Sequence, residues 1–76
     1  AIMDHQIPNA KELGMVVREA RKQQSLTQED LAGLTGTGRR FISDLEQGKE
    51  TAELGKVLLV LAALGLALYA LSKWSK

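Results

Sequence analysis

The sequence has no cysteine, one histidine and one proline among its 76 residues. The absence of cysteine excludes both a disulfide-stapled secreted scaffold and a thiolate zinc site. With His5 as the single imidazole, the chain also lacks the parts of a serine–histidine or cysteine–histidine catalytic set. The composition therefore predicts a protein that is not an enzyme and that holds neither a metal nor a cofactor.

The chain is also short and carries almost no net charge. A domain of this size buries only about 60% of its unfolded surface, so without disulfides it is marginal alone and we expect it to oligomerise. Ten Lys and Arg residues against nine Asp and Glu residues give a formal charge of +1. This balance neither favours nor excludes a nucleic-acid partner, because phosphate binding depends on where the charges lie.

Capping signals predict a first helix after a short N-terminal tail. Residues 1–8 show no periodicity, and no basic segment leads into an apolar run, so we expect a tail and no signal peptide. Asn9 and Glu12 then form the capping-box pattern that starts a helix over about residues 10–24.

Two more helices follow at short intervals. Thr27 with Asp30 starts a helix of about eight residues, which Gly36 ends. Thr37 is the predicted cap of the next helix, and Gly48 provides the left-handed exit from it. Two short helices joined by a tight turn predict a helix-turn-helix, the unit that many DNA-binding domains place in the major groove.

The last third of the chain changes from helical to alternating spacing. Thr51 is the predicted cap of a fourth helix over residues 52–64. After Gly65 the apolar residues alternate as in a buried strand, and a lone strand needs a partner ladder. We therefore expect residues 65–72 to pair with a second copy of the chain across a two-fold axis, followed by a tail over residues 73–76. The predicted dimer contacts are Leu59, Val60, Ala63, Leu66, Ala67, Leu68, Tyr69 and Leu71.

Basic side chains gather at the start of the third helix. Arg39 and Arg40 lie in its first turn, where the positive end of the helix dipole disfavours each by about 0.3 to 1 kcal/mol. Basic residues placed at a helix start with no visible compensating interaction indicate a function. An arginine there can donate hydrogen bonds to both O6 and N7 of a guanine. The alternative is that both arginines are solvated, or that one pairs with Asp44. The predicted base contacts are Gly38, Arg39, Arg40, Ser43 and Asp44.

A known family has similar residues around this turn. Residues 26–49 resemble the Xre or phage-repressor-like helix-turn-helix family, and residues 51–68 resemble HipB-type antitoxins. The resemblance implies a mainly α, lambda-repressor-like bundle of about four helices over residues 9–64, with one C-terminal strand pairing across a homodimer. The sequence departs from the family pattern at Thr35, where a branched apolar residue is more usual. The resemblance is carried by Leu26-Thr27-Gln28-Glu29-Asp30-Leu31-Ala32, Gly36 and Phe41-Ile42-Ser43-Asp44-Leu45-Glu46-Gln47-Gly48-Lys49.

The resemblance also implies roles for particular side chains. In the family, the residue that matches Gln28 clamps the DNA backbone, which suits a side chain at a helix start with free N–H groups. The residues that match Arg21 and Glu46 form an ion pair between two helices, so we interpret both as scaffold. The predicted phosphate contacts are Thr27, Gln28, Thr37 and Lys49.

These features predict a transcriptional repressor that binds an operator palindrome in double-stranded DNA as a dimer. Its expected location is the bacterial cytoplasm, at the nucleoid. By resemblance, its protein partner is a HipA-type serine/threonine kinase toxin, and Trp74 either contacts that partner or packs over the dimer strand. A free-standing Xre-family regulator is the alternative. A third interpretation is a membrane-anchored protein, although the uncharged residues 57–71 are short for a span, which needs about 20 residues.

Overall fold

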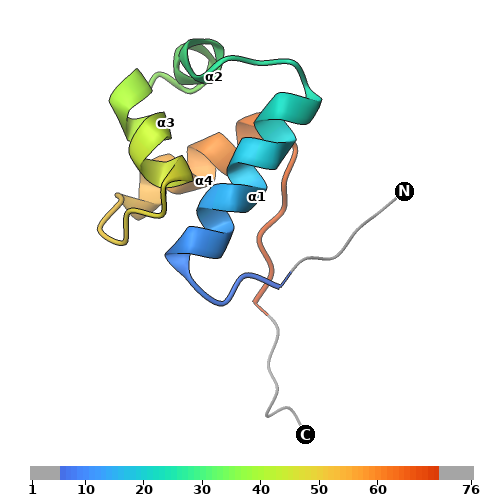
Figure 1. Ribbon diagram of the computed structural model, residues 1–76, viewed down its shortest axis with the longest axis vertical. Helices are drawn as coiled ribbons and strands as arrows, with labels where there is room; N and C mark the ends of the chain where they lie inside the picture. Colours follow the sequence, from blue (N-terminus) through green and yellow to red (C-terminus); the bar gives the residue numbers. More distant parts are fainter. Residues whose placement is uncertain (1–5, 71–76) are drawn as a thin grey trace, which may run out of the picture.

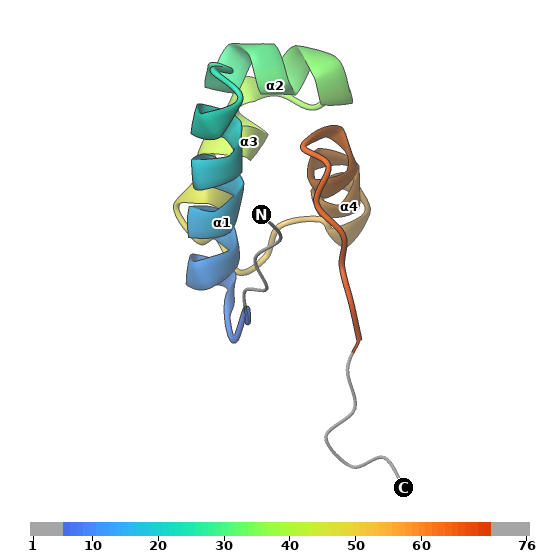
Figure 2. The same cartoon turned by 90° about the vertical axis from the view of Figure 1, so that its right-hand side faces the viewer.

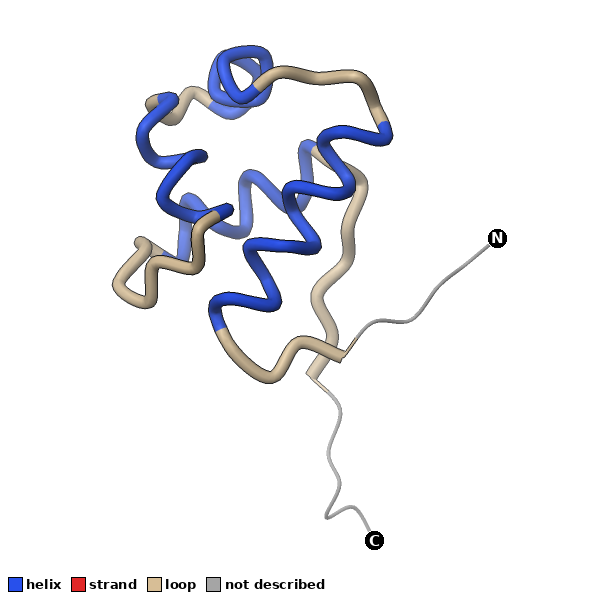
Figure 3. Tube along the Cα trace, viewed as in Figure 1, coloured by secondary structure: helices blue, strands red, loops and turns tan. Residues whose placement is uncertain are grey.

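The computed structural model describes residues 6–70, and these fold into four helices. The first helix packs against the third, and the second packs against both the third and the fourth (Figure 1 and Figure 2). Within residues 6–70 every regular element is a helix (Figure 3). The helices are α1 (Ala10–Gln23), α2 (Gln28–Thr35), α3 (Arg39–Glu46) and α4 (Leu54–Ala63).

All four helices contribute to one apolar core. Its largest fully buried side chains come one from each helix: Val17, Leu31, Ile42 and Val60. Burying a side chain of this kind stabilises the fold by about 1.5 to 3 kcal/mol. The other buried apolar residues are Ala32, Leu45, Val57, Leu61 and Leu64.

α1 and α3 approach each other closely at Gly14. A Cβ atom at this position would lie 2.7 Å from the carbonyl oxygen of Glu46 and would overlap the carbonyl oxygen of Leu45. Only a residue without a side chain allows the two backbones to come this near. Gly14 therefore sets the position of α3 on α1, a role that the sequence analysis missed.

The predicted starts of α1 and α2 are confirmed. The Asn9 side chain accepts a hydrogen bond from the backbone N–H of Glu12 at 2.9 Å. Thr27 and Asp30 form a reciprocal capping box, with both hydrogen bonds at 2.9 Å. The pKa of the Asp30 carboxyl is lowered, mainly by the backbone N–H of Thr27 and next by the Thr27 side chain.

The predicted caps of α3 and α4 are wrong. The N-cap of α3 is Gly38, which has no side chain, because the Thr37 hydroxyl is instead paired with the Thr35 hydroxyl at 2.9 Å. α4 begins later than predicted, with Glu53 at its N-cap and no side-chain cap. The chain makes a turn at residues 50–51, so Thr51 lies too early to cap that helix.

Three helices end in the same way. A residue in the left-handed region follows the helix cap of α1, α3 and α4: Ser25 at φ 59°, Gly48 at φ 90° and Gly65 at φ 75°. The N–H of the next residue then bonds back to a carbonyl in the last turn, which satisfies groups that helix ends leave unpaired. These bonds run from Leu26 to Arg21 at 3.1 Å, from Lys49 to Asp44 at 3.0 Å and from Leu66 to Leu61 at 2.8 Å.

α4 buries one stripe and leaves its other side open to solvent. Val60 was expected at the dimer interface, but it is fully buried in the core of the single chain. Leu59 and Ala63, on the other side of α4, are exposed. Within residues 6–70 no helix, α4 included, has the length and apolar character that crossing a membrane requires.

The segment after α4 leaves the helical body. Residues 66–70 have no regular structure; Leu66 is half-buried against the core of the single chain, and the chain beyond it extends away from the four helices (Figure 2). A strand at this position would need backbone hydrogen bonds from a strand of a second chain. The strand and the dimer therefore stay predictions. Leu71 and Trp74 lie outside the described residues.

Candidate nucleic-acid interface

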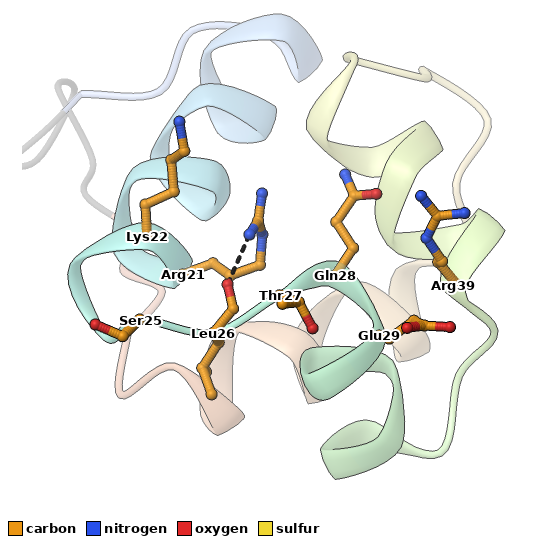
Figure 4. Close-up of a pocket in the computed structure, with 8 residues that line it drawn as sticks. All are labelled: Arg21, Lys22, Ser25, Leu26, Thr27, Gln28, Glu29 and Arg39. Atoms are coloured by element: carbon orange, nitrogen blue, oxygen red, sulfur yellow. Dashed lines mark hydrogen bonds between the residues drawn. The ribbon is translucent and has the colours of Figure 1, made fainter.

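The starts of α2 and α3 border one hollow of about 530 Å³. The hollow brings together Thr27 and Gln28, both predicted phosphate contacts, and Arg39, a predicted base contact (Figure 4). The end of α1 and the loop after it close the hollow on the other side. The lining residues are Arg21, Lys22, Ser25, Leu26, Thr27, Gln28, Glu29 and Arg39.

The charges around this hollow favour an anion. Lys22 and Arg39 are exposed, and no ion pair to either is formed among residues 6–70. Glu29 is the opposing carboxylate, and the charge of Arg21 is offset by a buried partner. The first turn of α2 begins at the same place, where the Thr27 side chain takes the N–H of Asp30 and leaves those of Gln28 and Glu29. Two available cations and a helix start together form a site suited to a phosphate.

Arg21 and Glu46 form the buried ion pair that the resemblance implied. Nε of Arg21 lies 2.6 Å from Oε2 of Glu46, and Nη2 lies 3.0 Å from Oε1. The two side chains are only 10% and 3% exposed. The Arg21 pKa is raised, mainly by its hydrogen bond to Glu46. Nη1 also donates to the carbonyl oxygen of Leu26 at 2.7 Å, so Arg21 joins α1, α3 and the loop before α2 (Figure 4).

Gln28 is bonded to the same carboxylate. Its Nε2 donates to Oε1 of Glu46 at 3.1 Å, and its side chain is half-buried. Sequence reasoning did not predict this contact. The two residues are 18 positions apart on different helices, and no local spacing signals such a bond.

A second charged cluster lies on the far side of α3. Asp44 is 3.9 Å from Nε of Arg40 and 3.6 Å from Nζ of Lys49. The Arg40 side chain is 93% exposed, so this pair with Asp44 contributes little to stability. The alternative interpretation, in which an arginine pairs with Asp44, therefore holds for Arg40. With Gln47 and Gly48, the three residues line a smaller hollow of about 360 Å³.

The turn between α2 and α3 is held by hydroxyl groups. The Thr35 hydroxyl bonds to the carbonyl oxygens of Leu31 at 2.9 Å and Ala32 at 3.3 Å, and to the Thr37 hydroxyl at 2.9 Å. Thr35 thus forms a polar clamp at a position where the resemblance implied an apolar residue. The clamp fixes the chain just before Gly38.

Two predicted base contacts remain, Ser43 and Gly38, and of these Ser43 is half-buried. Its hydroxyl accepts from the Gln47 side chain at 3.4 Å. Gly38 is exposed, and no atom lies within 4 Å of where its Cβ would be. The start of α3 therefore offers an open backbone surface.

Comparisons with known proteins agree with this geometry. Residues 17–71 match the sequence model of the Helix-turn-helix family. The chain is 50% identical over 66 residues to y4mF of Sinorhizobium fredii (strain NBRC 101917 / NGR234), an uncharacterised HTH-type transcriptional regulator, and the match covers 87% of each protein.

Solved structures of HipB have the same fold. In a HipB-O4 20mer complex, the similarity has a TM-score of 0.83 at 23% identity, covering 92% of this chain and 99% of the other. In a HipA-HipB-O2-O3 complex, the TM-score is 0.84 at 23% identity, with coverage of 92% and 99%. At this level of identity the similarity establishes the four-helix fold alone.

Proposed function

The chain belongs to the helix-turn-helix family, and from that premise we propose that it is a DNA-binding repressor that inserts α3 into the major groove. The observation that carries the proposal is the hollow between α2 and α3. It combines a helix start, Gln28 and two cations, Lys22 and Arg39, that form no ion pair within residues 6–70. A phosphate held there would place the adjacent α3 along the groove.

Base recognition is assigned to the exposed side of α3. Arg40 is the strongest candidate because its guanidinium is almost wholly exposed and only loosely held by Asp44. The same pairing keeps Asp44 beside Arg40, so Asp44 orients the arginine or accepts from a cytosine amino group. The full set proposed for base contact is Gly38, Arg39, Arg40, Ser43 and Asp44.

Phosphate binding is assigned to the two edges of α3. Gln28 and Thr27 lie at the hollow on one edge, and Lys49 follows the left-handed exit on the other. Thr37 completes the set, with its hydroxyl held by Thr35. These contacts fix the register of the protein on DNA and carry no sequence information of their own.

We propose a dimer as the DNA-binding form. The exposed apolar side of α4 continues into residues 66–70, and a monomer of this size has little reason to expose so much apolar surface. Pairing across a two-fold axis would present two copies of α3 about 34 Å apart, which suits an operator palindrome. The proposed contacts are Leu59, Ala63, Leu66, Ala67, Leu68 and Tyr69.

The finer proposal is an antitoxin that binds a HipA-type kinase and represses its own operon in the cytoplasm. It is supported by the fold shared with HipB. One of the similar structures is a HipA-HipB-O2-O3 complex. The alternative is a regulator without a toxin. Affinity purification from the source cells distinguishes the two, because an antitoxin retains a kinase in a fixed ratio and a free-standing regulator does not.

Selection from a pool of randomised duplexes tests the DNA-binding function. The wild-type protein should enrich a palindrome with half-sites about one helical turn apart. Arg40→Ala should lose about 1 to 3 kcal/mol of preference at one position of each half-site. Arg18→Ala, which changes an exposed arginine of α1, should keep the preference. If Arg40→Ala instead weakens all sequences equally, its assigned role in base recognition is wrong.

A further inference from the structure

One buried carboxylate connects the scaffold to the candidate DNA surface. Glu46 accepts two hydrogen bonds from Arg21 and one from Gln28. Arg21 comes from α1, Gln28 from the start of α2 and Glu46 from the end of α3. The same three helices surround the hollow, so whatever fixes this carboxylate also fixes the side chain that faces the hollow.

The carboxylate decides which way the Gln28 amide is turned. An ionised carboxylate paired with arginine only accepts hydrogen bonds, so it can face the amide nitrogen of Gln28 but not its oxygen. Figure 4 shows the amide oxygen of Gln28 turned toward the side of Arg39. With the amide reversed, its oxygen would face the Glu46 carboxylate, and two acceptors would meet with no hydrogen between them.

This orientation leaves a donor for a phosphate. Nε2 of Gln28 carries two hydrogens, and Glu46 takes one of them. The other remains for an acceptor in the hollow, and a phosphate oxygen is purely an acceptor. Arg21 neutralises Glu46, so the carboxylate positions Gln28 without repelling the phosphate.

We infer that Glu46 is a positioning residue for DNA binding, which holds the Gln28 amide so that its second N–H meets a backbone phosphate. This inference rests on the proposed DNA-binding function. It gives Glu46 a role beyond its ion pair, because a partner that only stabilised the fold would not affect how Gln28 contributes to DNA affinity.

A double-mutant cycle tests the inference on a mixed-sequence duplex of about 25 base pairs, long enough for two half-sites. In the wild-type background, Gln28→Ala should weaken binding about tenfold, the size of one charge-assisted hydrogen bond. In a Glu46→Gln background, the facing amide can present its NH₂ group as well as its oxygen, so it no longer fixes the orientation of Gln28, and Gln28→Ala should change affinity by less than about twofold. Lys49→Ala, the matched control, should cost the same factor in both backgrounds.

Two outcomes of the cycle would contradict the inference, and one would contradict the proposed function. If Gln28→Ala costs the same factor in both backgrounds, Glu46 is scaffold only and the inference is wrong. If Gln28→Ala has no effect in the wild-type background, the inference is also wrong, because there is no phosphate contact to position. A wild-type protein that does not bind the duplex would instead overturn the proposed function.

A measurement on the wild-type protein covers the case in which Glu46→Gln does not fold. NMR should show slower hydrogen exchange at the Gln28 carboxamide than at that of Gln23, which is exposed at the end of α1. Addition of the duplex should shift the Gln28 carboxamide resonances and leave those of Gln23 in place. Equal exchange rates at the two carboxamides would refute the inference.

Discussion

Gly14 of α1 lies against the backbone of Leu45 in α3, so closely that a Cβ atom at residue 14 would overlap the Leu45 carbonyl oxygen. The contact lies at the end of α3, next to the buried pair of Arg21 and Glu46. The close helix contact at Gly14 and the buried ion pair thus fix the same end of α3. The position of the proposed recognition helix depends on both.

Gly14→Ala should therefore lower the free energy of unfolding. Overpacking of this kind costs about 1 to 3 kcal/mol, against a gain of up to about 1 kcal/mol in helix propensity. Gly33→Ala is the matched control, since it lies within α2 and has no atom within 4 Å of its Cβ position. It should be neutral or stabilising. Urea unfolding of both variants checks the prediction, and equal shifts in their midpoints would contradict it.

Ser25→Gly should stabilise the protein. Ser25 has a positive φ of 59°, a conformation that costs about 1 kcal/mol for a residue with a Cβ and little for glycine. Gln23→Gly, two residues earlier in the helical region, should instead destabilise by about 0.5 to 1 kcal/mol. Thermal unfolding by circular dichroism distinguishes the two, and a lower Tm for Ser25→Gly would show that the left-handed residue is not strained.

Asp30 should make the stability depend on pH in the acid range. Because its folded-state pKa is lowered, the charged carboxylate stabilises the fold above its unfolded pKa, and this contribution is lost as the pH falls through the folded pKa. Asp30→Asn lacks the charge at every pH. The stability difference between wild type and Asp30→Asn should thus shrink as the pH falls below 3.8, the unperturbed value. An NMR titration of Asp30 with a midpoint at or above 3.8 would contradict the mechanism.

Salt dependence should distinguish the two kinds of phosphate contact. Lys49→Ala removes a charge, so it should weaken binding to all sequences and reduce the slope of log K against log salt by about 1 per subunit. Gln28→Ala should also weaken all sequences alike, but it should leave the slope unchanged because glutamine is neutral. Fluorescence anisotropy titrations over a range of salt concentrations measure both. A changed slope for Gln28→Ala would refute a neutral contact.

Leu59→Ser should dissociate the proposed dimer. Leu59 is 54% exposed in the single chain, so the fold should tolerate serine while the dimer loses the burial of two leucines. We expect the dimer dissociation constant to rise at least about tenfold. Leu34→Ser, at a 64% exposed leucine of α2, should leave it unchanged. Sedimentation equilibrium reports both values, and equal behaviour of the two variants would exclude this face of α4 from the interface.

The local parts of the fold could be predicted from the sequence. The starts of α1 and α2 depend on bonds between residues three apart, Asn9 with Glu12 and Thr27 with Asp30, and such spacings are visible in a sequence. The cap of α3 was assigned to the wrong residue because Thr37 had a competing partner in Thr35. That choice between two hydroxyl bonds depends on the turn geometry, which the spacing does not reveal.

Non-local features could not be predicted in the same way. α4 is apolar nearly all round, so its sequence does not say which side faces the core, and Val60 was placed on the wrong side. The contact between Gln28 and Glu46 and the close approach at Gly14 both join distant segments. The ion pair of Arg21 with Glu46 was predicted only through resemblance to a family. Packing between helices decides such contacts, and a single sequence does not encode them in any local pattern.

The left-handed residues that follow α1, α3 and α4 also determine where the proposed binding surfaces lie. Three parts of the proposed surface begin directly after a left-handed residue: the hollow beside α2 at Leu26, the far edge of α3 at Lys49, and the segment after α4 at Leu66. The backbone N–H of each of these residues donates a hydrogen bond to a carbonyl of the preceding helix. Backbone bonds therefore set the direction in which the chain leaves each of these three helices. Substitution of an exposed recognition residue would therefore change what the surface contacts and leave the direction of the backbone in place.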